Sequence, residues 1–234
     1  MQRLATACEA IAATTKKLQK TSIVAEYFRS RTVEEAAVSA VFLSGRAFPA
    51  WAETTLQIGG RSIWQIVAEL AGKGESDLTA AYRRLGDLGA VARDVLPQRP
   101  GQGIGLLEVS EGFRQIAAAR GTAAKTALVC ELLSRATPLE AKYIVKIMTG
   151  DLRIGLKESL VEEAVARAYG APAGELKDIQ RANMLLGDIG ETLRMAAGGK
   201  LADARLRMFH PLGFMLASPI DSAEEGLSYF SEAA

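Results

Sequence analysis

Apolar residues recur at intervals of three or four positions along almost the whole chain, which is the spacing of α-helices that bury one face. The segment after Gly155 carries one such apolar stripe, formed by Leu160, Val161, Ala164, Val165 and Ala168. Near the start of the chain another apolar face is formed by Leu4, Cys8, Ile11 and Thr15. Glu9 interrupts this stretch, so we expect a helix here and not a signal peptide.

Several segments carry residues that satisfy the first amides of a helix. Capping-box spacing occurs for Thr32 with Glu35, for Thr137 with Glu140, and for Ser222 with Glu225. Pro138 also occupies a first helical position. The one strand-like piece is 104–109, which follows a run containing proline and glycine at 97–105. The pattern as a whole predicts an all-α fold.

A duplicated module is the most informative feature of the sequence. Residues 15–45 recur as residues 120–150, and further matches follow in the same order for 56–59 (LQIG) with 152–155 (LRIG) and for 86–89 (GDLG) with 187–190 (GDIG). This period is far longer than that of solenoid repeats, so we expect two pseudo-symmetric halves that share a core. We place the first half at 1–96, a linker at 97–109, the second half at 110–210, and a connector to a following domain at 211–234.

Composition restricts the possible functions. A net charge of +1 gives no overall sign of nucleic-acid binding, so any basic surface has to be local. Two cysteines and one histidine, His210, provide neither a disulfide framework nor the spacing of a zinc site. No apolar run reaches the roughly 18 residues of a membrane span. We therefore expect a cytoplasmic protein, with a structural role for His210.

Motifs for catalysis or nucleotide binding are lacking in the sequence. Gly101, Gly103 and Gly105 have no strand before them, which a dinucleotide loop requires, and no GxxxxGK[ST] loop occurs. Adjacent acidic residues such as Glu162 and Glu163 are typical of helix caps and solvated faces. An enzyme complete within this chain is therefore the least supported hypothesis.

The segment 150–157 (GDLRIGLK) has the properties of an anion site. Gly150 can end one helix in the left-handed conformation, and Gly155 can begin the next helix without a side chain over its first amides. Arg153 and Lys157 flank the turn, and two further lysines lie on the helix before it. The alternative is a tight glycine turn between two helices with solvated cations.

The first copy of the module contains a corresponding turn. Its glycines are Gly45 and Gly59, and Arg46 and Arg61 lie nearby. The loop is longer by residues 48–51 (FPAW), and glutamine replaces the arginine of the second copy. A second basic, glycine-bounded turn is thus expected in the other half.

Lys20 and Lys125 occupy equivalent positions near the starts of equivalent helices. A cation there opposes the helix dipole and needs a compensating anion, which a phosphate would supply. The alternative is an exposed lysine paired with a neighbouring acid.

Four segments together resemble the N-terminal DNA-binding domain of ATP-dependent DNA ligases: 140–143 (EAKY), 150–155 (GDLRIG), 187–190 (GDIG) and 211–217 (PLGFMLA). The resemblance implies an all-α domain of two pseudo-symmetric halves that lies on the minor groove of nicked duplex DNA without sequence specificity. It also implies phosphate contacts on both sides of the nick. The candidate DNA-binding residues are Gly45, Arg46, Gly59, Gly150, Arg153, Gly155 and Lys157, with Lys20 and Lys125 added by the anion argument.

The ligase family uses a lysine in a K-x-D-G motif for its chemistry, and this chain contains no such motif. The resemblance therefore implies a binding module that ends before the catalytic lysine, and no cofactor in this chain. For the parent ligase it implies ATP and Mg²⁺, nucleotidyltransferase and OB-fold domains as partners, a role in DNA repair, replication or recombination, and in a bacterium association with the nucleoid. An α-helical protein-interaction scaffold is the alternative function.

Overall fold

The computed structural model describes residues 1–52, 54–170, 175–210 and 222, and these residues form helices and loops with no strand. The helices are α1 (Gln2–Ala12), α2 (Lys17–Arg29), α3 (Val33–Leu43), α4 (Gly60–Ala71), α5 (Glu75–Leu85), α6 (Leu88–Val95), α7 (Leu106–Ala118), α8 (Thr122–Arg135), α9 (Pro138–Met148), α10 (Glu158–Tyr169), α11 (Leu176–Leu186) and α12 (Ile189–Ala197), with short 3-10 turns η1 (Ala50–Ala52) and η3 (Leu201–Asp203). The all-α prediction is confirmed over these residues. None of these helices combines the length and the apolar character needed to cross a membrane.

The expected strand at 104–109 is wrong. Helix α7 begins at Leu106, where the amide of Gly105 donates to the Glu108 carboxylate at 2.7 Å. Val109, Phe113 and Ile116 are buried with Leu106, so the strand-like piece is the first turn of a longer helical stripe. The helical period could not be recognised within 104–109 alone, because the other buried residues of the same helix face, Phe113 and Ile116, lie beyond it.

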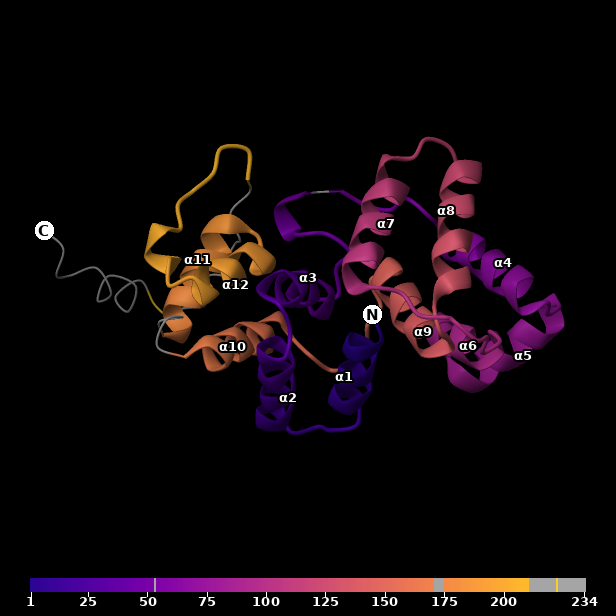
Figure 1. Cartoon of the computed structure of the whole chain (residues 1–234), viewed down its shortest axis with the longest axis horizontal. Coiled ribbons are helices and arrows are strands. Elements are labelled where there is room, and N and C mark those ends of the chain that lie inside the picture. Colours follow the sequence, from indigo (N-terminus) through magenta and orange to yellow (C-terminus); the bar gives the residue numbers. More distant parts are fainter. Residues whose placement is uncertain (53, 171–174, 211–221, 223–234) are drawn as a thin grey trace, which may run out of the picture.

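Two lobes lie side by side, as Figure 1 shows: α2, α3, α10, α11 and α12 form one lobe, and α4 to α9 form the other. Each lobe combines helices from before and after the run at 97–105. In one lobe α10 packs on α2 and α12 packs on α3, and in the other α4 packs on α8 and α6 packs on α9. The duplication and the division at 97–109 stay predictions, but the helices before and after that division clearly exchange partners.

Corresponding glycine motifs make this exchange possible. Gly86 and Gly187 end α5 and α11 in the left-handed conformation, with φ of 66° and 60°. Three residues further on, a Cβ on Gly89 would lie 2.5 Å from the carbonyl oxygen of Lys142 in α9, and one on Gly190 would lie 2.8 Å from that of Ala37 in α3. The two glycines therefore allow close helix packing in each lobe.

Helix caps agree with the sequence where they are described. The Thr32 hydroxyl accepts from the amide of Glu35, and Thr137 does the same for Glu140, each as a reciprocal capping box. The box expected for Ser222 with Glu225 is not tested, because Glu225 lies outside the described residues. In α1 the predicted apolar face is buried at Leu4, Cys8 and Ile11, whereas Thr15 lies beyond the end of the helix and is exposed.

A charged cluster joins α1 to α6 and α9. The carboxylate of Glu9 accepts hydrogen bonds from Lys142, from the Tyr143 hydroxyl at 2.6 Å and from Arg93 at 2.9 Å. Burial alone would raise the pKa of Glu9, but these hydrogen bonds outweigh it and lower the pKa from 4.5 to about 2. The cluster therefore contributes to stability only while Glu9 is ionised.

We expect Gly89→Ala to destabilise the domain, because the added methyl group meets the backbone of α9. A clash of this kind costs about 1–3 kcal/mol. Gly60→Ala is the matched control, since nothing lies within 4 Å of a Cβ there, and it should stabilise the fold by about 0.4–1 kcal/mol. Denaturant unfolding measures both, and a Gly89→Ala variant as stable as the wild type would contradict the close packing of α6 on α9.

The lowered pKa of Glu9 predicts how the stability of the fold depends on pH in the acid range. A carboxyl whose pKa is lowered on folding stabilises the fold above its unfolded value and loses that contribution as the pH falls towards its folded value. Wild-type stability should therefore decline between pH 4.5 and about pH 2, and Glu9→Gln should be less stable at neutral pH with a shallower decline. Denaturant midpoints across this range test it, with Glu111→Gln as a control at an exposed pair with Arg114. Parallel pH curves for wild type and Glu9→Gln would refute it.

Candidate nucleic-acid interface

Two glycine turns end α3 and α9 in the same way. Gly45 has φ of 78° and its amide donates to Phe42, whereas Gly150 has φ of 68° and its amide donates to Ile147. The left-handed helix end predicted for Gly150 is confirmed, and Gly45 matches it. A Cβ at either glycine would meet nothing within 4 Å. Conformation and not packing therefore requires glycine, and both turn surfaces are open.

The two turns face a common groove of about 450 Å³. Its lining comes from the loop after α3 and from the C-terminal end of α9, and includes Gly45, Arg46, Phe48, Leu56, Met148 and Gly150. The fold thus brings candidate residues from both predicted halves to one place. This juxtaposition could not be seen in the sequence, because it depends on how the lobes pack.

A second pair of corresponding positions is strained. Gln57 and Arg153 have φ of 49° and 45°, although neither is glycine. Such residues are uncommon in the left-handed region and cost of order 1–3 kcal/mol, and they persist where the surroundings fix them. The two residues are matched in the predicted repeat, and the backbone is left-handed at both.

The expected helix start at Gly155 is wrong, whereas a helix does begin at Gly59, which the sequence marked only as the end of a turn. Gly59 is the N-cap of α4, but α10 has Lys157 as its N-cap, and Gly155 lies before it with φ of 62°. Between Gly155 and the start of α10 the chain makes a further turn, whereas α4 begins directly after Gly59. Gly155 is therefore required for a left-handed turn and not for room over the first amides.

Lys20 and Lys125 do not lie where a phosphate could pair with them. Only 6% and 5% of their surface is exposed. The Nζ of Lys20 donates to the carbonyl oxygens of Ile154 and Gly155 at 2.7 and 2.9 Å, and the Nζ of Lys125 donates to that of Leu56 at 3.0 Å. Protein carbonyl groups thus take the place of the expected anion, because the helices bury these side chains against the opposite turns.

The remaining cations have different surroundings. Arg46 is exposed and pairs with Glu158 in the first turn of α10 at 3.1 Å. Arg153 is exposed and its Nε lies 2.5 Å from Asp151. Lys157 is exposed at the N-cap of α10. Exposed pairs contribute about 0–1 kcal/mol, so Arg46 and Arg153 can exchange these carboxylates for a phosphate at little cost.

Two lysines of α9 contribute less positive charge than the sequence suggests. Lys142 pairs with Glu9, and Lys146 is buried and pairs with Asp87. Both acids lie far from α9 in the sequence and are placed by the packing of α1 and α6. The local excess of basic residues at 142–157 is therefore largely balanced by the fold.

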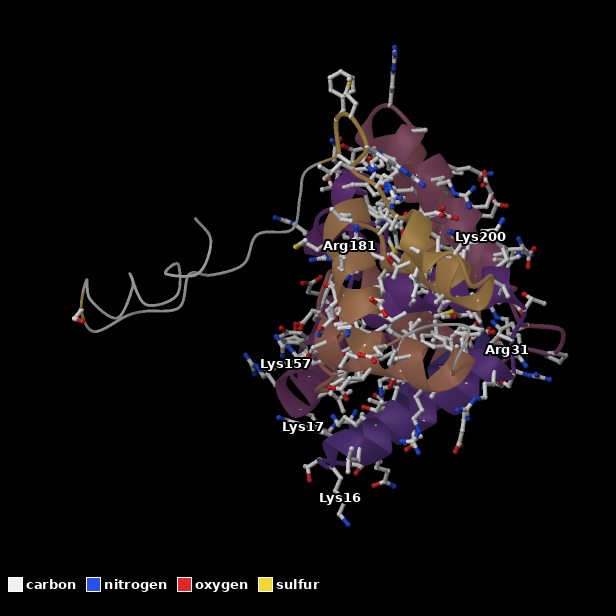
Figure 2. All side chains as sticks on the ribbon, turned by 90° about the vertical axis from the view of Figure 1, so that its left-hand side faces the viewer. Lys16, Lys17, Arg31, Lys157, Arg181 and Lys200 are labelled. Atoms are coloured by element: carbon white, nitrogen blue, oxygen red, sulfur yellow. The ribbon has the colours of Figure 1, made fainter. Side chains whose placement is uncertain are left out.

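Exposed cations lie along one edge of the molecule in Figure 2. Lys17 at the start of α2, Lys157 at α10 and Arg181 in α11 project to this side, whereas Arg31 and Lys200 project to the opposite side. We call Lys17, Lys157 and Arg181 the basic stripe. The sequence pointed to Lys157, but neither Lys17 nor Arg181 was among the candidate residues.

The inserted segment of the first copy joins the two halves. The Trp51 ring stacks on His210 with centroids 4.2 Å apart, and its indole nitrogen donates to Asp188 at 3.2 Å. The amide of Trp51 also donates to the carbonyl of Gly187 at 3.1 Å. These contacts fit the structural role expected for His210.

The chain matches known proteins over most of its length. The family described as DNA ligase N terminus matches residues 1–166. A probable DNA ligase of Koribacter versatilis is 57% identical over 237 residues, covering 100% of this chain and 40% of the relative. A probable DNA ligase of Opitutus terrae is 39% identical, covering 98% of this chain and 26% of the relative, and a DNA ligase of Methanopyrus kandleri is 33% identical, covering 96% and 42%.

The chain is a member of the DNA ligase N-terminus family. It spans 26% to 42% of the length of these three relatives. Within the residues described, no group of histidine, cysteine and carboxylate side chains is placed to hold a metal ion.

Proposed function

We propose that this chain is the DNA-binding domain of an ATP-dependent DNA ligase and holds the phosphates of nicked duplex DNA without reading its bases. One observation carries the proposal: the open turns at Gly45 and Gly150 line the same groove, in a chain of the DNA ligase N-terminus family. Two similar turns at one groove can contact a duplex at two points along its backbone.

The turns have the chemistry that phosphate binding needs. At Gly45 and Gly150 a backbone without side chains allows close approach of a ligand. The first amides of α4, after Gly59, and of α10, after Lys157, can attract anions. Arg46 lies in the groove and Lys157 lies at the start of α10, next to the Glu158 that pairs with Arg46. These cations supply the long-range attraction, and the turns supply the close contacts.

The basic stripe extends this surface. Lys157 belongs both to the predicted turn and to the stripe, which continues to Lys17 and Arg181 on helices that pack against α10 (Figure 2). Phosphate contacts of this kind fix the position and orientation of a duplex but carry no base information. The proposed module therefore binds many sequences with similar affinity.

The parent enzyme would supply the chemistry. A nucleotidyltransferase domain would form the lysyl-adenylate with ATP and Mg²⁺, and an OB-fold domain would close on the DNA. The part proposed for this chain is to hold the nick in place for DNA repair, replication or recombination. Gly45, Arg46, Gly59, Gly150, Arg153, Gly155 and Lys157 are the backbone contacts proposed from the sequence.

Lys157→Ala and Arg153→Ala should each weaken binding to nicked DNA, equally on unrelated sequences. Each lost phosphate contact should reduce the magnitude of the slope of log affinity against log salt by about 0.9. The measurement is a salt titration on two nicked duplexes of different sequence. Lys200→Ala is the matched control, because this lysine is exposed on the side opposite to Lys157 (Figure 2).

The outcomes separate the alternatives. A loss confined to one duplex sequence would indicate base readout, which for a good bidentate contact costs about 1–3 kcal/mol. Unchanged affinity and slope for both variants would refute the proposed surface at this turn. Weak binding to DNA with little response to salt would favour the protein-interaction scaffold, whose apolar contacts depend little on counterion release.

A further inference from the structure

We propose that Lys20 and Lys125 are positioning residues that aim backbone amides at phosphate, each acting on the turn in the opposite half of the sequence. This inference rests on the proposed function and adds the groups that hold the DNA-facing turns in shape. It also assigns the phosphate contact at the second turn to the amides of Gly155 and Leu156.

The contacts of Lys20 reach across the molecule. Lys20 lies in α2, yet its ammonium group donates to the carbonyl oxygens of Ile154 and Gly155 at 2.7 and 2.9 Å. A Cβ on Gly155 would lie 2.6 Å from the Lys20 Nζ. The lysine tip therefore sits directly against this turn, which is left-handed at Arg153 and at Gly155.

Lys125 makes the corresponding contact in the other direction. Lys125 lies in α8, and its ammonium group donates to the carbonyl oxygen of Leu56 at 3.0 Å and lies 3.4 Å from the Gln57 Oε1. Gln57 is the strained residue of this turn. The turns at Gln57 and Arg153 are thus each held by a buried lysine from the other half.

The burial of these lysines indicates that their hydrogen bonds to the turns are needed. An ammonium group buried without partners is very unfavourable, so a lysine kept in such a place needs its hydrogen bonds satisfied. Here the partners are carbonyl oxygens of exposed, strained turns, and an apolar side chain of similar length would fill the space without holding them. Exposed fractions of only 6% and 5% also leave no room for a phosphate at either ammonium group.

Peptide geometry links the hydrogen bonds of the two lysines to phosphate binding. In a trans peptide the carbonyl and the amide of one unit point in opposite directions. Lys20 holds the carbonyls of Ile154 and Gly155, so the amides of Gly155 and Leu156 point away from it. Neither amide donates to another group within the described chain. Such outward amides form a concavity that binds anions.

The first turn follows the same geometry. Lys125 holds the carbonyl of Leu56, so the amide of Gln57 points away from the lysine, and it too donates to no group in the part of the chain described. By holding these carbonyl groups, the two buried lysines keep the amides of the same peptide units pointing outward at both turns. Exposed cations attract the duplex, and these amides give phosphate its close partners.

The first test compares Lys20→Met, Lys125→Met and the control Lys200→Met, at a lysine exposed on the side opposite to the basic stripe, on nicked DNA over a salt series. Loss of hydrogen bonds to a charged group predicts that Lys20→Met binds about tenfold or more weakly. The slope of log affinity against log salt should stay at the wild-type value, because no phosphate contact of the side chain is lost. A slope reduced by about 0.9 would instead show a direct phosphate contact and overturn the proposal.

The second test uses hydrogen exchange of the protein without DNA. Lys20→Met should speed exchange at the amides of 153–156 and leave 56–58 as in the wild type, and Lys125→Met should do the reverse. Unchanged hydrogen exchange at both turns would overturn the proposal that the lysines hold them in shape. Because this readout needs no DNA, it tests the positioning role of the lysines separately from the proposed function. Failure of the proposed function would appear as wild-type protein that does not bind DNA.

A third measurement uses wild-type protein, so it decides the matter even where a variant fails to fold. Amine labelling followed by mass spectrometry should find Lys20 and Lys125 unreactive with and without DNA. Lys17 and Lys157 should react, and DNA should protect both. Reaction of Lys20 at the rate of Lys17, with protection by DNA, would overturn the proposal.

Discussion

The exchange of helices between the two parts of the chain is the constraint on which the other features depend. Packing of α6 on α9 and of α12 on α3 requires backbones to approach at Gly89 and Gly190, where a side chain would meet a carbonyl oxygen. Because of this exchange, α2 lies beside the turn that precedes α10, and α8 lies beside the loop that precedes α4. The lysine contacts and the shared groove follow from it.

Local signals predicted the helices well and their partners poorly. Thr32 and Thr137 marked helix starts because capping acts within one turn of chain. Pairing of Lys146 with Asp87, and burial of Lys20 against Ile154, depend on segments distant in the sequence. The sequence therefore overestimated the local positive charge and took a buried lysine for a phosphate partner.

The turn residues were likewise predicted correctly only where the signal is local. Gly150 was recognised because a left-handed helix end favours glycine wherever it occurs. Gly155 was assigned to a helix start, since nothing in the sequence shows that α10 begins later than its counterpart α4. Exposed cations divide between opposite sides of the molecule only in three dimensions, so Arg181 could not be grouped with Lys157 in advance.

The central claim is that phosphate meets backbone amides at turns from both parts of the chain. The most direct measurement is the change in amide chemical shifts when wild-type protein is titrated with nicked duplex DNA. The account predicts the largest changes at the outward amides of Gln57, Gly155 and Leu156, and smaller ones at Gly45 and Gly150, whose amides already donate within the protein. Changes confined to the α7 and α8 surface, with these turns unaffected, would contradict it.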